Sequence, residues 1–139
     1  MVYATKQNPE EYQRLASLLT EGNAYAARAY LLLLGCAVLH YDYQHRPNRH
    51  AQYDTGAAMH ALFLQAVELG LIAHEMGGFD VERAHSELDI SDTVEPMAMM
   101  AIGYPGDVAL LNEEIRKRHD APRKRKTPVE FAFKGKWPA

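Results

Sequence analysis

The longest pattern of apolar positions in the chain runs from His50 to Gly70 and has the spacing of a helix. Apolar side chains occupy two of its sides: Met59, Leu62, Phe63, Ala66 and Leu69 on one, and Ala57, Ala61 and Leu64 on the other. Apolar surface on most sides predicts burial on most sides, either within the chain or against a second subunit. Small residues at 56–58 and 61 would let another helix approach closely. Periodicity alone leaves both possibilities open.

Two apolar runs predict the central strands of a sheet. The first extends from Ala29 to Leu39 and is too short for most buried helices. The second, Met97 to Ile102, follows a loop that ends at Glu95-Pro96 and is closed by turn residues at 103–107. Residues 2–5 are rich in β-branched and aromatic side chains, so they predict a further strand at the start of the chain.

Helix signals lie on both sides of these strands. Asn8 and Pro9 predict the start of a helix that runs to about Leu19 with one apolar face. Residues 110–119 predict a charged, exposed helix. The alternating segment 129–133 predicts a last strand.

Composition narrows the class of protein. The chain has 139 residues, of which 47% are apolar and 24% charged, and this predicts a single globular domain over residues 1–139. The net charge of −3 provides no basic field for nucleic acid. No apolar run approaches the roughly 20 residues of a membrane helix, and no signal layout is visible. Cys36 is the only cysteine and lies in an apolar run, so we expect it to pack as a small hydrophobe in a reducing compartment, by default the cytoplasm.

A pair of glycines is the first candidate for chemistry. Gly70 ends the long helix, and a short Leu-Ile-Ala step leads to a loop with Gly77-Gly78 just before the predicted helix cap Asp80 and its helix over 81–88. Two glycines at a helix start can present bare N–H groups to a ring carbonyl or an anion. Glycine pairs also commonly do no more than turn the chain, and the pair alone does not decide between these readings.

Four adjacent cations, Arg123 to Lys126, form the second candidate. Such a run is usually a solvated tail. Arginine forks suit phosphate oxygens, so a run held by ordered structure could instead bind a phosphate. A third candidate, the loop 40–50, contains three histidines and an aspartate, but it lacks the ligand spacing of a zinc site, and we expect no metal there.

Several segments, in order over nearly the whole chain, carry a family resemblance. They are Gly22-Asn23 before Ala26-Ala27-Arg28-Ala29, Tyr53 to Met59, Leu69-Gly70-Leu71, Met76 to Asp80, Glu95-Pro96, Gly103-Tyr104-Pro105, and Arg123 to Lys126 followed by Glu130-Phe131. In this order and spacing the chain resembles the nitroreductase family of FMN-dependent oxidoreductases.

The resemblance implies an α+β fold in which helices flank a mixed, mainly antiparallel sheet. It also implies an intertwined homodimer with the long central helix at the interface and the C-terminal segment crossing to the partner. Members of the family bind FMN between subunits, reduce it with NADH or NADPH, and pass the electrons to a small acceptor such as a nitroaromatic or a quinone.

Carried over to this chain, the resemblance implies that Met76, Gly77 and Gly78 belong to the loop whose N–H groups face N5 and O4 of the flavin. Arg123 and Arg125 best match the phosphate contacts, and Lys124 or Lys126 could substitute for them. No side chain is expected to act as an obligatory acid or base. His74 and Glu75 are candidates to line the pocket.

The chain also departs from the family pattern. An Arg-x-Ser-x-Arg-like segment that grips FMN, and a later Asn/Gln-Pro-Trp segment, precede the strand that we place at residues 2–5. We therefore expect a domain truncated at its N-terminus that lacks about half of the flavin site. A fragment, a natural truncation and completion by another polypeptide would each explain this. The alternative function is a non-catalytic dimerisation or binding module that has lost FMN.

Overall fold

The computed structural model describes residues 1–43 and 46–138, which form two compact units, Met1–Pro105 and Gly106–Ala139. The first unit is built on a four-stranded antiparallel sheet of order β1-β2-β4-β3. Its strands are β1 (Val2–Thr5), β2 (Leu31–Val38), β3 (Ile72–Met76) and β4 (Val94–Gly103). Its helices are α1 (Pro9–Ala16), the 3₁₀ helix η1 (Glu21–Arg28), α2 (Ala51–Glu68) and α3 (Val81–Glu87).

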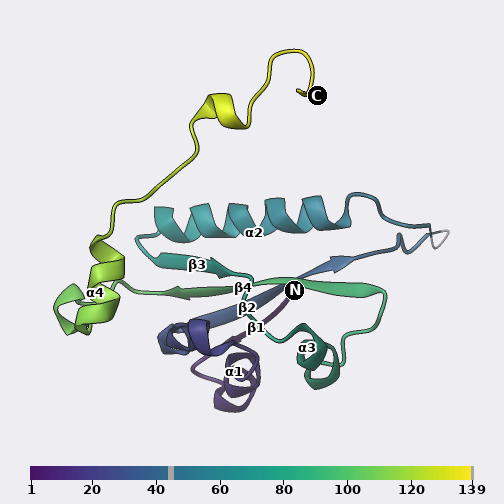
Figure 1. Cartoon of the computed structure of the whole chain (residues 1–139). Coiled ribbons are helices and arrows are strands. Elements are labelled where there is room, and N and C mark those ends of the chain that lie inside the picture. The colour runs from purple at the N-terminus through teal and green to yellow at the C-terminus, as the bar shows by residue number, and fades with distance from the viewer. Residues whose placement is uncertain (44–45, 139) are drawn as a thin grey trace. The chain divides into compact units, whose positions relative to one another are not determined.

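Helices cover both faces of the sheet, with α2 along one face and α1 and α3 along the other (Figure 1). Alternate residues of the central strands supply the two cores. Leu32, Leu34 and Met99 pack with side chains of α1, η1 and α3. Leu33 and Met100 pack with side chains of α2. The apolar runs predicted as central strands are therefore the two inner strands, and the predicted α+β fold with a mainly antiparallel sheet is confirmed.

Strand β4 begins earlier than predicted, because Glu95 and Pro96 lie inside it and do not end a loop. Its pairing with β2 shifts by one residue, from Gly35 opposite Ala98 to Cys36 opposite Pro96. The shift is a β-bulge, a position where a proline without an N–H donor is tolerated in a sheet. The bulge explains how pairing continues beyond Pro96 to the end of the strand.

The predicted stop of the long helix at Gly70 is confirmed. Gly70 has a φ of +74°, in the left-handed region that favours glycine. The N–H of Leu71 donates to the carbonyl of Ala66 at 2.9 Å, and the N–H of Gly70 donates to that of Val67 at 2.9 Å. This pair of bonds is a Schellman motif, which satisfies the last carbonyls of α2 and turns the chain into β3.

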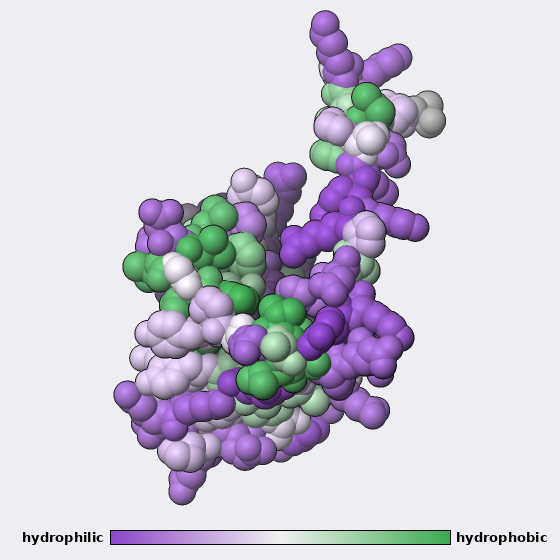
Figure 2. All heavy atoms as spheres, turned by 90° about the vertical axis from the view of Figure 1, so that its left-hand side faces the viewer, coloured by the Kyte–Doolittle hydropathy of each residue, from purple (hydrophilic) through white to green (hydrophobic). Residues whose placement is uncertain are grey.

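Helix α2 covers the sheet with a narrow part of its surface. Its buried residues are Ala51, Met59 and Ala66. Met59 packs directly on Gly35 of β2, where an added Cβ would lie 2.7 Å from the methionine sulfur. The exposed apolar residues at the end of α2 and the start of β3 are Leu64, Val67, Leu69 and Ile72. Figure 2, which views the end of the molecule where α2 stops, shows apolar surface there.

Helix α1 ends at Ala16 and does not continue to Leu19 as predicted. The reason is a tertiary contact: Leu19 forms a β-bridge with Phe79, and the carbonyl of Leu18 accepts the N–H of Asp80 at 2.8 Å. The backbone of these residues is thus used to hold a distant segment. The predicted cap of α3 is confirmed, since Asp80 Oδ1 accepts the N–H of Arg83 at 3.0 Å.

The second unit consists of the 3₁₀ helix η2 (Val108–Leu110), α4 (Glu113–Asp120) and the 3₁₀ helix η3 (Pro128–Glu130). The predicted charged helix is α4, capped by Asn112. The predicted strand at 129–133 is wrong. Thr127 donates its N–H and its hydroxyl to the carboxylate of Glu130, which favours a helical turn over an extended segment. No residue in the described part of this unit is buried.

Among the described residues, no helix combines the length and the hydropathy that crossing a membrane requires. Positions 44 and 45, inside the histidine-bearing loop 40–50, lie outside the described residues, so the expectation of no metal there stays a prediction.

Candidate functional site

The glycine loop, residues 77–78, follows the last residue of β3 and precedes the cap of α3. Buried side chains on both sides fix its ends in the core: Met76 is 4% exposed and Phe79 is 7% exposed. Gly77 is exposed and Gly78 is half-buried. The loop is therefore a short surface segment between two core residues. Of the three consecutive residues predicted for the flavin ring, Gly77 and Gly78 form the loop and Met76 is the buried last residue of β3.

Three donors converge on the carbonyl of Gly78. They are the N–H of Thr20 at 3.2 Å, the hydroxyl of Thr20 at 3.0 Å and the side-chain amide of Asn23 at 2.9 Å. Thr20 is the residue that precedes η1, and Asn23 lies within η1. We refer to Thr20 and Asn23 as the Gly78 clamp.

The clamp leaves no room for a side chain at position 78. An added Cβ at this position would lie 2.5 Å from Asn23 Nδ2 and 2.9 Å from Thr20 Oγ1, closer than real side chains approach. A larger residue would push these donors off the carbonyl. The requirement for glycine at this position thus comes from the protein's own packing.

Gly77 differs from Gly78 in this respect. Apart from its two chain neighbours, no described residue has an atom within 4 Å of the position where its Cβ would be, and its φ is outside the left-handed region. Within residues 1–43 and 46–138, neither the N–H of Gly77 nor that of Gly78 has an acceptor. The loop thus offers two unpaired donors beside open space, the arrangement that a hydrogen-bond acceptor on a ligand would use.

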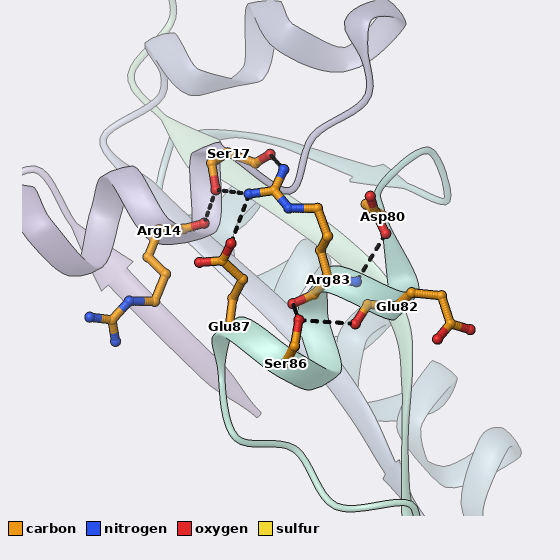
Figure 3. Close-up of polar contacts among 7 residues, drawn as sticks. All are labelled: Arg14, Ser17, Asp80, Glu82, Arg83, Ser86 and Glu87. Carbon is orange, nitrogen blue, oxygen red and sulfur yellow. Dashed lines mark hydrogen bonds and ion pairs between the residues drawn. The ribbon is translucent and has the colours of Figure 1, made fainter.

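A network of polar contacts holds α3 against the end of α1 (Figure 3). The guanidinium of Arg83 donates to the carbonyl of Ser17 at 2.9 Å and to its hydroxyl at 3.2 Å. Arg83 also forms an ion pair with Glu87 at 3.0 Å, but both side chains are about 40% exposed or more, so the pair contributes little to stability. The bonds to Ser17 join α3 to the end of α1.

His74 and Glu75, the candidates to line the pocket, lie in β3. Both are exposed. The Nε2 of His74 lies 2.9 Å from the hydroxyl of Tyr25 in η1, and the two rings are 6.0 Å apart. The pair links the edge strand to η1, two residues beyond Asn23. A role in lining the pocket stays a prediction.

Arg123 and Arg125 lie in the second unit, in the segment between α4 and η3, and both are exposed. The guanidinium of Arg125 donates to the carbonyl of Lys124 at 2.9 Å. Their proposed role in binding a phosphate stays a prediction.

A cavity of about 280 Å³ lies between the end of β2 and the start of α2 and is lined in part by Cys36, Asp54 and Thr55. Burial raises the pKa of the Cys36 thiol, so the thiol stays protonated at neutral pH and is a weak nucleophile. No group of three or more His, Cys, Asp or Glu side chains in the described part of the chain is arranged to hold a metal ion. The glycine loop is the stronger candidate for a site.

Comparison with known proteins identifies the family of the chain. Residues 3–104 match the nitroreductase family. An uncharacterised 15.4 kDa protein of Mycolicibacterium smegmatis is 44% identical over 128 residues, which are 92% of this chain and 85% of that protein. A crystal structure described as an oxidoreductase containing FMN is 34% identical and has a TM-score of 0.88 over 99% of this chain and 70% of its own. A nitroreductase family protein from Clostridium difficile is 20% identical and shares the fold, with a TM-score of 0.66 over 98% of this chain and 74% of its own.

The chain belongs to the nitroreductase family. The predicted family and fold are thereby confirmed, and membership supports a general oxidoreductase role. The loop fits the cofactor that the family implies. The N–H groups of Gly77 and Gly78 have no acceptor among the described residues, and there is open space where a Cβ of Gly77 would be. Such donors suit a flavin ring, whose edge carries acceptors.

Sequence reasoning missed the clamp. Asn23 contributed to the family resemblance without an assigned role, and Thr20 had no part in it. Thr20 lies 58 positions and Asn23 55 positions from Gly78, so no local sequence pattern predicts these contacts. The one available signal was Thr20 as a capping residue immediately before a helical segment.

Proposed function

We propose that this protein is an FMN-dependent oxidoreductase that takes electrons from NADH or NADPH and passes them to a small acceptor such as a nitroaromatic or a quinone. The observation that carries the proposal is the glycine loop. Its two N–H groups have no acceptor among the described residues, and its conformation is fixed by the Gly78 clamp and by buried neighbours.

Bound FMN would supply the redox chemistry, namely hydride transfer from the nicotinamide and then delivery of two electrons and a proton to the acceptor. The chain would contribute by binding and electrostatics. The N–H groups of Gly77 and Gly78 would donate to the acceptor edge of the ring, where negative charge increases on reduction. Donors that are already fixed in place stabilise such charge without the cost of reorienting.

The phosphate end of FMN would be held by Arg123 and Arg125, a role that the family resemblance supports. Guanidinium groups suit this task because their paired N–H donors match phosphate oxygens. Both side chains are exposed in the structure, so they are available to a ligand.

Substitution of Gly77 by alanine tests the proposal. The methyl group would meet no protein atom within 4 Å, so the thermal midpoint should not change. It would stand beside the two donors, and we expect FMN affinity, measured by quenching of flavin fluorescence, to fall about tenfold, the equivalent of one good hydrogen bond. Gly106→Ala is the matched control, because its Cβ would also meet no protein atom within 4 Å and it lies in the second unit. Equal FMN affinity in all three proteins would contradict the proposed site.

We also propose that the protein forms a homodimer through α2. The supporting observation is the apolar surface exposed at the end of α2, where Leu64 is 55% and Val67 50% exposed, and just after it, where Leu69 is 67% exposed. Surface of this kind commonly marks an interface. Light scattering should give the mass of two chains, and Leu64→Lys should shift it toward one chain. A wild-type mass of one chain at micromolar concentration would contradict the dimer.

The second candidate function is a non-catalytic dimerisation module without FMN. The apolar face of α2 favours it, because that face needs no cofactor to bind a second copy. Visible absorbance of the purified protein separates the two candidates. A colourless protein that takes up no added FMN and still forms a dimer would support the module and contradict the oxidoreductase.

A further inference from the structure

The carbonyl of Gly78 accepts more donors than a carbonyl usually does. A carbonyl oxygen has two lone pairs, and here three donors lie within 3.2 Å of it. We propose that Thr20 and Asn23 are positioning residues, which hold the two glycine N–H groups in the orientation that favours reduced FMN. This inference rests on the proposed function and assigns to the clamp a role in setting the redox potential of the site.

The clamp acts through two linked peptide groups. The carbonyl of Gly78 and the N–H of Phe79 belong to one peptide group, and that N–H donates to the carbonyl of Gly77 at 3.3 Å. The carbonyl of Gly77 in turn shares a peptide group with the N–H of Gly78. Holding the Gly78 carbonyl therefore also restrains the Gly78 N–H, one of the two donors of the site.

Such a restraint is needed because the loop consists of two glycines. Glycine has the widest choice of backbone conformations, so a free Gly77-Gly78 segment would present its N–H groups in many directions. The open space around Gly77 provides no steric limit. The polar contacts of Thr20 and Asn23 supply the limit that side chains would supply elsewhere.

The fold itself has other connections at this place. Asp80 donates its N–H to the carbonyl of Leu18, Leu19 pairs with Phe79, and Arg83 binds Ser17. Thr20 is exposed and Asn23 is half-buried, and neither belongs to the apolar core. Loss of the clamp should therefore leave α3 docked and change mainly the peptide orientation in the loop.

The effect should differ between the two oxidation states of the cofactor. Negative charge on the ring is greater after reduction, so well-placed donors favour reduced FMN over oxidised FMN. A general loss of fold would weaken both equally. The ratio of the two dissociation constants thus separates a positioning role from a structural one.

The variants are Thr20→Val, which removes a hydroxyl at nearly constant shape, Thr20→Ser, which keeps it, and Asn23→Leu, which removes the amide. Asn48→Leu is the matched control, since Asn48 Nδ2 also donates to a backbone carbonyl, that of Val38 at 3.3 Å, elsewhere in the unit. Dissociation constants are measured on the full chain for oxidised FMN and, under anaerobic conditions, for dithionite-reduced FMN. The midpoint potential of bound FMN is measured in parallel.

We expect Thr20→Val and Asn23→Leu to weaken oxidised FMN about threefold and reduced FMN about thirtyfold, within the range of one or two hydrogen bonds. The tenfold change in ratio corresponds to a midpoint potential lower by about 30 mV for a two-electron couple. Thr20→Ser and Asn48→Leu should keep the wild-type ratio. An unchanged ratio in Thr20→Val and Asn23→Leu would overturn the inference and leave the proposed function intact.

A wild-type protein that binds no FMN would contradict the proposed function, and the clamp would then be judged by amide exchange alone. In that case Thr20→Val and Asn23→Leu should speed exchange of the Phe79 amide several-fold, while the Asp80 amide, which donates to Leu18, stays as in the wild type. Equal exchange of the Phe79 amide in all proteins would overturn the positioning role.

Discussion

Replacement of Gly78 by alanine would place a methyl group 2.5 Å from Asn23 Nδ2 and 2.9 Å from Thr20 Oγ1. Contacts this short cannot persist, so both side chains must move away from the Gly78 carbonyl and give up their hydrogen bonds. Each bond contributes about 0.5–1.5 kcal/mol net, which predicts a loss of about 1–3 kcal/mol in the free energy of unfolding. Backbone strain adds nothing, because the φ of Gly78 lies outside the left-handed region.

Urea unfolding followed by circular dichroism measures this loss. With a slope of about 1–3 kcal/mol per molar urea, typical of small domains, the midpoint should fall by about 1 M. The same substitution in an Asn23→Ala background should cost less, because the amide that clashes and one of the bonds at risk are already absent. The expected coupling between positions 78 and 23 is about 1 kcal/mol.

The reasoning would be refuted if Gly78→Ala cost the same free energy in both backgrounds. Gly77→Ala provides the matched comparison, since its methyl group meets no protein atom. The two alanine variants should therefore separate: the one at 78 lowers stability and FMN affinity together, and the one at 77 lowers FMN affinity alone.

Four further outcomes are expected. Gly70→Ala forces a Cβ into a φ of +74° and should lower the thermal midpoint through a loss of about 1–2 kcal/mol; an unchanged midpoint would contradict the Schellman motif. Gly35→Ala places a methyl group against Met59 of α2 and should lower the free energy of unfolding, measured in urea, by about 1–3 kcal/mol; an unchanged urea midpoint would contradict this close packing. Alanine at Arg123 and Arg125 together should raise the dissociation constant of FMN more than that of riboflavin, and equal effects would argue against phosphate binding. Burial raises the pKa of Tyr12 above its ordinary value of 10.0. The stability that the buried neutral phenol provides is therefore present below pH 10 and is lost as the pH rises through the folded pKa. Tyr12→Phe should remove this alkaline dependence of the free energy of unfolding, measured by urea titration.

The sequence correctly predicted one helix end, one helix start and the two inner strands. Gly70 and Asp80 ended and began helices where the sequence indicated, because each acts through its own backbone or its nearest neighbours. The two apolar runs became the inner strands, because only central strands are buried on both faces.

The elements that were predicted wrongly, or were missed, depend on contacts between distant parts of the chain. The helix α1 stops early because Leu18 and Leu19 bind the backbone around Phe79, and β3 went unrecognised because the exposed His74 and Glu75 interrupt its apolar pattern at the sheet edge. Pro96 entered a strand because a bulge in the pairing accommodates it. The glycine pair could be found by reading the sequence, but the clamp could not, since its contacts span more than 50 residues.

This long span has a consequence for how the protein folds. Thr20 and Asn23 meet the Gly78 carbonyl 55–58 residues later in the chain, so the loop is held only when these distant segments have folded together. An ordered loop thus reports a completed fold, and a ligand bound there would recognise the native state alone. Such a ligand would raise the apparent stability of the whole first unit in proportion to the logarithm of its concentration. The resistance of this chain to unfolding in the cell would then depend on how much free cofactor the cell supplies.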